Sequence, residues 1–334
     1  MTHLWVWICK IESDDIHLNG QGYTYSIPLD IGKQVLEDIQ KEWLPILTQN
    51  SVEDPDHCYD ELLKIIKSKE EPRYYYYFLS ALNLACWDLF LKAKHCSLKT
   101  FFEITHDTVP LYASGGWLSL SIPELISECA SFQAQNINAY KFKVGGDQDE
   151  ERITALRHDF PKMTLYADSN QFFKTSEAAL SFCALLKKHH IEWFEEPLLG
   201  DDTDALKTLS SDSPVSIATG ENRLTFEEFE ELCQTSVEYI QPDVVRCGGI
   251  TGFLRIALLC QQYNKKLSAH LNPELSAPLI AKMSGHSVEM MSLFSLNFFT
   301  HPIYPFEGKM PIPTDIGIGV TLSEKTITQY KVCY

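Results

Sequence analysis

The sequence has no cysteine pairs of the kind that mark a disulfide framework or a zinc site. Its ten cysteines are scattered over 334 residues, and none forms a Cys-x-x-Cys pair. This spacing is typical of reduced, mostly buried thiols. The chain also has no apolar run of about 18 residues, and no basic, apolar and small-residue signal pattern at its N-terminus. We therefore expect a soluble, cytoplasmic protein without a membrane span.

Positive charge is scarce as well. Lysine and arginine number 28 against 45 aspartates and glutamates, and the formal net charge is −17. Such a balance argues against nucleic acid or an anionic membrane surface as a partner. It does not exclude a small anionic substrate, because cations inside a site act at short range while distant charges are screened. We expect a small-molecule substrate, and a homo-oligomer as the assembled form.

What the sequence does contain is a series of short apolar, β-type runs that each stop on a titratable side chain. These side chains are Lys143, Asp168, Glu195, Glu221, Asp243 and His270. They follow one another at intervals of 25, 27, 26, 22 and 27 residues, the length of one strand, one helix and two loops. A β/α barrel has this period, and it directs the C-terminal ends of its parallel strands into one shared mouth. The sequence therefore predicts a barrel with a polar site at that mouth.

Three of these strand ends are acidic and follow one another directly: Asp168, Glu195 and Glu221. Carboxylates that converge without compensation repel by about 4 kcal/mol per pair at close range and intermediate dielectric. A hard divalent cation resolves this repulsion, and oxygen-only ligands favour Mg²⁺ over zinc. The alternative is that each acid only caps a helix in a βα loop. Regular recurrence beside lysines and a histidine favours the metal site.

The regular period covers only part of the chain. Residues 1–108 lack it and are expected to form an α+β domain, with strands at 4–11 and 20–25 before three helices. Residues 109–300 form the predicted barrel, and the proline- and glycine-rich segment 301–334 is expected to return to the first domain. The expected helices lie at 31–47, 55–67 and 74–94 in the first domain, and at 123–134, 149–158, 176–188, 203–209, 225–233 and 252–263 in the barrel.

The strand ends belong to longer motifs. These are Lys-Phe-Lys at 141–143, Ala-Asp-Ser-Asn at 167–170, Trp-Phe-Glu-Glu-Pro at 193–197, Gly-Glu-Asn-Arg at 220–223, Gln-Pro-Asp at 241–243, Gly-Gly-Ile-Thr at 248–251 and Ser-Ala-His at 268–270. In this order the chain resembles the enolase superfamily and, within it, the mandelate racemase subgroup with its acid-sugar dehydratases. The resemblance extends from about Ile8 to Tyr330. It implies an α/β fold in which an α+β capping domain covers a modified (β/α)7β TIM-type barrel.

The resemblance implies that Asp168, Glu195 and Glu221 hold a Mg²⁺ ion. Glu195 is chosen over Glu196 because the family uses the first acid of this pair. The subgroup depends on Asp243, because muconate-cycloisomerase-like and dipeptide-epimerase-like members of the superfamily carry a lysine at that strand end. The aspartate is the pattern of the racemase subgroup.

Two acid/base groups on opposite faces of the substrate are also implied. One is Lys143, and the other is His270 oriented by Asp243. Lys141 would lie beside the substrate carboxylate and the Mg²⁺ ion, and Glu289, near the eighth strand, would hydrogen-bond that carboxylate. A neighbouring ammonium and a metal ion would lower the pKa of Lys143 and let it act as a base.

Four further residues are predicted to line the substrate site. Asn170 belongs to the second of the motifs, and Arg246 lies where a cation is common in the subgroup. Tyr23 or Tyr25 would reach the site from the capping domain. Family chains usually begin with an extra strand and a mobile loop ahead of the position of Met1. We expect that without them the mouth stays open, unless a partner chain covers it.

The implied chemistry is removal of the proton next to a carboxylate. We expect a carbon–oxygen lyase (hydro-lyase) that uses Mg²⁺ to dehydrate an aldonic or aldaric sugar acid to a 2-keto-3-deoxy acid. One alternative is a racemase or epimerase of a 2-hydroxy acid that uses the same two bases without elimination. Another is a shortened, non-catalytic member of the fold.

Overall fold

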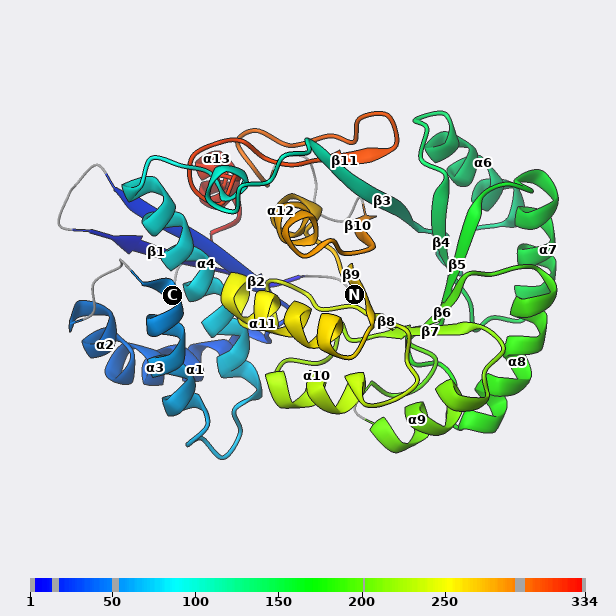
Figure 1. Cartoon of the computed structure of the whole chain (residues 1–334), viewed down its shortest axis with the longest axis horizontal. Helices are drawn as coiled ribbons and strands as arrows, with labels where there is room; N and C mark the ends of the chain where they lie inside the picture. Colours follow the sequence, from blue (N-terminus) through cyan, green and yellow to red (C-terminus); the bar gives the residue numbers. More distant parts are fainter. Residues whose placement is uncertain (1–3, 14–17, 50–53, 201, 292–297, 332–334) are drawn as a thin grey trace.

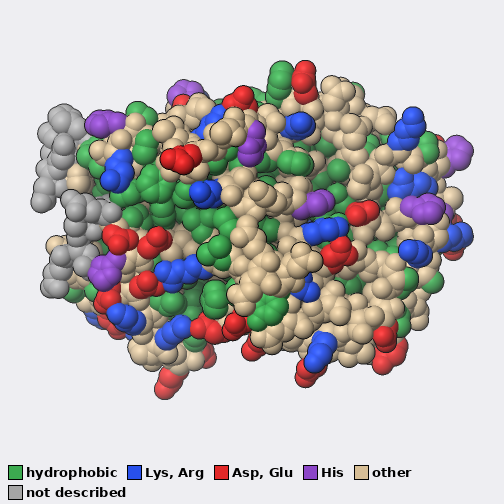
Figure 2. Space-filling model, viewed as in Figure 1, with side chains coloured by type: hydrophobic (Ala, Val, Ile, Leu, Met, Phe, Trp, Pro, Cys, Tyr) green, Lys and Arg blue, Asp and Glu red, His purple; other side chains and the backbone are tan. Residues whose placement is uncertain are grey.

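The computed structural model describes residues 4–13, 18–49, 54–200, 202–291 and 298–331. Figure 1 shows a ring of strands wrapped by helices, with a smaller group of helices and a two-stranded ribbon beside it. On the face drawn in Figure 2, side chains of both charge signs are interspersed, so this face carries no continuous patch of one sign. Within the described residues, no helix is long and apolar enough to cross a membrane.

Eight parallel strands close into the ring. Each strand pairs with the next one in the sequence, and the last pairs back with the first between residues 288–291 and 111–114. This confirms the predicted α/β fold with a (β/α)7β barrel. The strands are β3 (Thr108–Gly115), β4 (Ala139–Lys143), β5 (Thr164–Asp168), β6 (Trp193–Glu195), β7 (Ser216–Thr219), β8 (Tyr239–Ile240), β9 (Lys266–Ala269) and β10 (Ser287–Met291). The intervening helices are α6 (Ile122–Gln133), α7 (Asp149–Asp159), α8 (Ser176–Lys188), α9 (Thr203–Asp212), α10 (Phe226–Cys233), α11 (Gly249–Gln262) and α12 (Pro273–Met283).

Several details of the secondary structure differ from the prediction. Helix α12 was not predicted; it contains two prolines, of which Pro273 occupies the permissive start of the helix and Pro278 lies inside it. The single helix expected at 31–47 is two helices, α1 (Leu29–Glu42) and α2 (Leu44–Gln49). The break falls just before Pro45, which has no N–H to continue the helical ladder.

The residues before the barrel form a helical layer on a β-ribbon. Strand β1 (Val6–Glu12) pairs antiparallel with β2 (Asn19–Tyr25), and the ribbon packs on α4 (Arg73–Ala93). Gly22 makes this contact possible, since a Cβ there would lie 2.0 Å from the carbonyl oxygen of Ala81. The remaining helices of this part are α3 (Pro55–Ile66) and α5 (Leu98–Phe101). The packing directs β2 toward the barrel.

The segment after the barrel touches both parts. Strand β11 (Lys309–Pro311) pairs antiparallel with the start of β3, and the chain then reaches the ribbon and α4. There the buried Asp88 carboxylate accepts hydrogen bonds from the backbone of Gln21, at 3.0 Å, and of Ile318, at 3.1 Å. A short helix, α13 (Glu324–Tyr330), follows. The predicted domain boundaries after residues 108 and 300 remain predictions.

Aromatic side chains fill the barrel below its mouth. The rings of Tyr166 and Trp193 stack with centroids 3.6 Å apart, and Tyr112 meets both edge-on. The Trp193 indole N–H donates to Glu195 Oε2 at 3.1 Å, and the Lys141 ammonium lies 5.7 Å from the Tyr112 ring centre. This packed layer is the floor of the site, and it keeps water away from the charged groups above it.

Candidate active site

Strand register places the predicted residues in one row. Lys143 at the end of β4 is paired with Asp168 at the end of β5, and Asp168 is paired with Glu195 at the end of β6. Glu221 follows β7, and His270 follows β9. Because parallel strands bring their carboxyl ends to one rim, side chains that are far apart in the sequence meet there.

Lys141 is the cation at the centre of the site. Its ammonium contacts Glu195, lies 2.8 Å from Glu289 Oε1 and 3.4 Å from Asp168 Oδ2, and its side chain is 1% exposed. Burial by itself would lower the pKa of Lys141, but the attraction of Glu195, Glu289 and Asp168 outweighs it and raises that pKa. The three carboxylates therefore favour the charged form of Lys141.

Lys143 occupies one flank of the site. Its ammonium lies 2.5 Å from Asp168 Oδ2 and 5.4 Å from the centre of the Trp117 ring. It opens onto a cavity of about 300 Å³ at the mouth of the barrel. The cavity is lined by Trp117, Leu118, Ser119, Lys143, Val144, Ser169, Asn170 and Phe172. Lys143 and the predicted substrate residue Asn170 thus share one solvent-accessible space.

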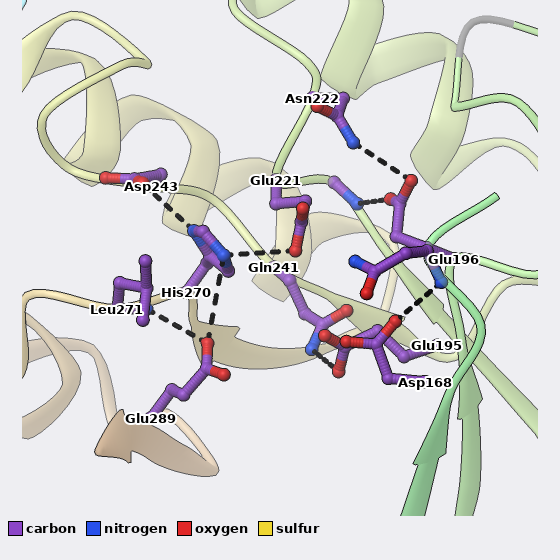
Figure 3. A network of polar contacts seen from close by, with 12 residues as sticks. Asp168, Glu195, Glu196, Glu221, Asn222, Gln241, Asp243, His270, Leu271 and Glu289 are labelled. Atoms are coloured by element: carbon purple, nitrogen blue, oxygen red, sulfur yellow. Dashed lines mark hydrogen bonds and ion pairs between the residues drawn. The ribbon is translucent and has the colours of Figure 1, made fainter. Parts of the chain in front are cut away.

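His270 occupies the other flank, where its two ring nitrogens face different partners (Figure 3). Nδ1 lies 2.9 Å from Asp243 Oδ2, while Nε2 lies 3.0 Å from Glu221 Oε2 and 3.9 Å from Glu289 Oε2. Burial would lower the pKa of His270, but Glu221 and Asp243 outweigh it and raise the pKa to about 10. The structure thus brings the predicted His270–Asp243 pair together and turns Nε2 toward the acidic residues.

The buried carboxylates outnumber the cations that compensate them. Burial raises the pKa of Glu195 to about 8 despite Lys141, and Asp168 adds to the shift. The pKa of Glu221 moves the other way, to about 2, because the attraction of His270 outweighs its burial. The site therefore holds fewer positively charged groups than carboxylates.

The predicted Mg²⁺ ligands are engaged with protein cations in this arrangement. Asp168 contacts both lysines, Glu195 contacts Lys141, and Glu221 contacts His270. Accordingly, in the described part of the chain, no three His, Cys, Asp or Glu side chains are gathered closely enough to hold a metal ion. The donor chemistry nevertheless fits Mg²⁺, since three adjacent strand ends offer only carboxylate oxygens in a buried, negatively charged setting.

Sequence reasoning gave Glu196 no role, and the structure shows how it differs from Glu195. Glu196 accepts hydrogen bonds from neutral groups, including Gln171 Nε2 at 2.9 Å and Asn222 Nδ2 at 3.1 Å. Its backbone has a positive φ of 43°, which turns the chain directly after β6. Glu195 therefore faces Lys141, while Glu196 faces the loop after β7 (Figure 3).

Three of the predicted substrate residues lie behind the dyad and do not line the cavity. Tyr23 and Tyr25 are each 2% exposed, and their hydroxyls donate to Asn272 Oδ1 and Asp243 Oδ2. Arg246 donates to the carbonyl of Glu221 at 3.1 Å, and its Nε lies 3.4 Å from Asp243 Oδ2. These side chains are enclosed between the ribbon and the barrel and contact protein groups there, and their predicted contact with substrate stays a prediction.

The loop that carries Trp117 is held by two residues that the sequence did not single out. Glu128 Oε2 accepts from the backbone N–H of Gly116 at 2.6 Å. Arg152 donates to the carbonyl oxygens of Gly116, at 2.8 Å, and of Leu120, at 2.7 Å. Both come from neighbouring helices, α6 and α7, and no spacing in the sequence links them to the loop.

Comparisons with known proteins agree on one group of relatives. Residues 124–326, well over half of the chain, match the family described as enolase C-terminal domain-like. An L-talarate/galactarate dehydratase of Salmonella typhimurium is 29% identical over 97% of this chain and 82% of its own length. A 3,6-anhydro-alpha-L-galactonate cycloisomerase of Streptomyces coelicolor is 27% identical over 94% of this chain and 88% of its own length.

Solved structures give the same result. The L-talarate dehydratase of Polaromonas sp. JS666, complexed with Mg and L-glucarate, superimposes with a TM-score of 0.87 at 27% identity, covering 97% of this chain and 91% of that one. A racemase of Streptomyces coelicolor with bound magnesium gives a TM-score of 0.90 at 25% identity, covering 98% and 92%. The similar proteins thus include sugar-acid dehydratases, cycloisomerases and a racemase, and some hold magnesium.

Proposed function

The chain belongs to the enolase C-terminal domain-like family of the enolase superfamily, and from that premise we propose that it is a Mg²⁺-dependent dehydratase of aldonic or aldaric acids. The observation that carries the proposal is the placement of two proton-transfer groups, Lys143 and His270, on either side of the acidic strand ends. Around the ring, the strands of Asp168, Glu195 and Glu221 lie between them.

Recognition of the substrate carboxylate is assigned to the centre of the site. When bound by Asp168, Glu195 and Glu221, Mg²⁺ supplies a Lewis acid that makes the proton next to the carboxylate more acidic. Lys141 presents a permanent ammonium to the same region. Glu289, whose Oε1 lies 2.8 Å from that ammonium, is assigned to the same substrate carboxylate.

Proton removal is assigned to whichever flank faces the proton on carbon 2. Lys143 Nζ takes it on one face and His270 Nε2 on the other, according to the configuration of that carbon. Asp243 holds the opposite ring nitrogen of His270 at 2.9 Å, and Nε2, which lies 3.0 Å from Glu221 Oε2, is the nitrogen assigned to proton exchange with substrate.

Elimination completes the dehydration. His270 Nε2, once protonated, donates its proton to the hydroxyl on carbon 3, and the C–O bond breaks with release of water. The enol that remains takes a proton on carbon 3 and loses the proton of its carbon-2 hydroxyl, and becomes the 2-keto-3-deoxy acid. The small cavity beside Lys143 leaves room for the carbons beyond carbon 3.

A panel of aldonic and aldaric acids with MgCl₂ tests the proposal. We expect at least one acid to yield a 2-keto-3-deoxy product, and we expect EDTA to abolish its formation and Mg²⁺ to restore it. Lys143→Ala and His270→Asn serve as controls for a contaminating activity. If no acid in a broad panel gives a ketone, or if both variants match the wild type, the dehydratase proposal fails.

A racemase or epimerase is the second candidate, because bases on both flanks also suit inversion without elimination, and a racemase is among the similar structures. The same panel in D₂O separates the two activities. Epimerisation places deuterium on carbon 2 and inverts it without releasing ketone, whereas dehydration releases ketone. A protein that catalyses neither deuterium exchange nor ketone release would instead be a non-catalytic member of the fold.

A further inference from the structure

A chain of hydrogen bonds runs from the two-stranded ribbon to the histidine dyad. Tyr25 at the end of β2 donates to Asp243 Oδ2 at 2.5 Å, and that oxygen also faces His270 Nδ1 at 2.9 Å. Asn272 Nδ2 donates to the other oxygen, Asp243 Oδ1, at 3.1 Å. It also lies 3.2 Å from the Tyr25 hydroxyl, while Tyr23 donates to Asn272 Oδ1 at 2.8 Å. All five side chains are 5% exposed or less.

The donors and acceptors of this chain form a consistent set. Tyr23 gives its proton to the amide oxygen of Asn272, whose amide nitrogen serves Tyr25 and Asp243, and Tyr25 gives its proton to Asp243. Both oxygens of the aspartate are thereby fixed by donors other than His270. A buried network that is fully satisfied holds its members in one arrangement.

The backbone at Asn272 is adapted to this contact. Leu271 and Asn272 both have positive φ, 47° and 45°, in the left-handed region that asparagine tolerates better than most residues. Asn272 is the N-cap of α12, a position where asparagine usually bonds the first helical N–H groups, yet its side chain makes no such bond. The amide is turned to Asp243 instead of capping the helix.

We propose that Tyr25 and Asn272 are positioning residues for proton transfer by His270. Together with the backbone N–H of Val245, which donates to Oδ1 at 3.0 Å, and Arg246 Nε, 3.4 Å from Oδ2, they hold both oxygens of Asp243. They thereby fix the rotation of the carboxylate and, through it, the ring of His270, so that Nε2 faces carbon 2 of the substrate. Lys143 lies across the acidic row and shares no hydrogen bond with this network. The inference rests on the proposed function in one respect, namely that His270 exchanges a proton with substrate.

The experiment measures each flank separately with the full-length protein and Mg²⁺. Two substrates that are epimers at carbon 2 are incubated in D₂O, and deuterium incorporation is followed by proton NMR. Lys143→Ala and His270→Asn identify which epimer exchanges through which base. We expect Tyr25→Phe and Asn272→Gly to slow the His270-dependent exchange about 10- to 100-fold and to leave the Lys143-dependent exchange within about two-fold.

The variants are chosen to separate positioning from folding. Phenylalanine keeps the Tyr25 ring, and glycine keeps the left-handed backbone at residue 272. Tyr75→Phe is the matched control: its hydroxyl also donates to a carboxylate, Asp38 Oδ2 at 2.6 Å, but within the helices beside the ribbon, and we expect no change in either exchange rate. Equal slowing at both flanks, or slowing at neither, would overturn the inference.

A second measurement needs no substrate and keeps the inference apart from the proposed function. Nitrogen-15 NMR of the imidazole ring, with the His270 signals identified from His270→Asn, reports the hydrogen bond at Nδ1. We expect Tyr25→Phe and Asn272→Gly to shift these signals and Tyr75→Phe to leave them in place. Unchanged signals in the first two variants would overturn the positioning role. A wild-type protein that exchanges neither epimer would instead refute the proposed function.

Discussion

The two flanks of the acidic row are built in different ways. Lys143 ends β4, has one carboxylate partner, Asp168, and opens onto a cavity with the exposed indole of Trp117. His270 follows β9 and lies at the end of a buried network that begins in the β-ribbon. One flank thus depends on the barrel alone, and the other depends on contact between the two parts of the molecule.

This difference separates two ways of fixing a base. A lysine at the end of a strand needs only the register of that strand, because its flexible side chain finds the adjacent acid. An imidazole must also be rotated correctly about its own axis, which requires a partner at the second ring nitrogen. The ribbon therefore supports His270, the base whose orientation needs the additional partner.

The largest expected effect is the loss of either base. Lys143→Ala and His270→Asn should each slow ketone formation about 10²- to 10⁴-fold, since general acid–base catalysis contributes roughly that factor. Each variant should keep α-proton exchange on the remaining flank, as measured by deuterium incorporation. Melting curves serve as the control for folding. If one variant abolished exchange of both epimers, the two flanks would not act independently.

Loss of Lys141, the cation between the two flanks, should have the next largest effect, and this effect is on stability. Lys141→Met removes the ammonium shared by three buried carboxylates, and we expect the free energy of unfolding to fall by about 3–5 kcal/mol in urea titrations with EDTA present. Lys143→Met should lower it less, because that ammonium has one carboxylate partner at the edge of a cavity. Equal losses would show that Lys141 is not the main compensating charge.

Behind the His270 flank, Glu274 should make stability depend on pH. It lies in the first turn of α12, and burial raises its pKa from the ordinary 4.5 to about 7. A carboxyl with a raised folded-state pKa stabilises the fold fully below about pH 4.5, and this contribution is lost as the pH rises through 7.

Glu274→Gln stays neutral at both pH values. Its advantage over the wild type in the free energy of unfolding should therefore be about 1–2 kcal/mol larger at pH 8 than at pH 4.5, a range that allows for the partial exposure of this side chain. Urea titrations at the two pH values measure this difference. Exposed Glu324 provides a control in Glu324→Gln, which should show little change with pH. A Glu274→Gln advantage that did not grow with pH would contradict the assignment.

The smallest expected effect is at the open flank. Trp117→Ala removes a ring 5.4 Å from the Lys143 ammonium, and an exposed cation–π contact contributes about 0.5–1 kcal/mol. Exchange through Lys143 should slow about two- to five-fold, with His270-dependent exchange unaffected. Leu258→Ala, an exposed residue of α11 outside that cavity, is the control. An equal effect on both flanks would mean that Trp117 acts on the whole mouth.

The barrel could be predicted from the sequence because its signal is local and repeated. Six successive strand ends carry or are closely followed by a titratable residue, and the spacing between these residues equals one βα unit. Helix α12 was missed, and it holds a proline, Pro278, in its interior, where proline is usually unfavourable. Nothing local distinguishes such a proline from one that ends a helix.

At the site, the sequence predicted which residues meet but not how they pair. It placed Asp168, Glu195 and Glu221 around one ion, whereas their carboxylates contact Lys141, Lys143 and His270 in this structure. The resemblance gave the His270–Asp243 pair, and the geometry brings it together.

The hydrogen-bond network behind the His270–Asp243 pair could not be predicted from the sequence. Tyr25 precedes Asp243 by 218 residues, and the bond between them exists only because the ribbon packs against the barrel. Asn272 looks like an ordinary helix cap until its left-handed backbone is seen. Contacts that depend on tertiary packing and backbone conformation have no characteristic spacing in the sequence, so the sequence could not predict them.

Closure of the ring has a consequence for synthesis. The last barrel strand, β10, supplies the partner that the edge of β3 lacks, and β3 leaves the ribosome about 180 residues earlier. Until then the nascent barrel is an open sheet with an unpaired edge that invites wrong pairing or chaperone binding. Ribosome-stalled chains that end before residue 287 should remain sensitive to protease, whereas released full-length protein should resist it. Early resistance would mean that the partial sheet is already protected.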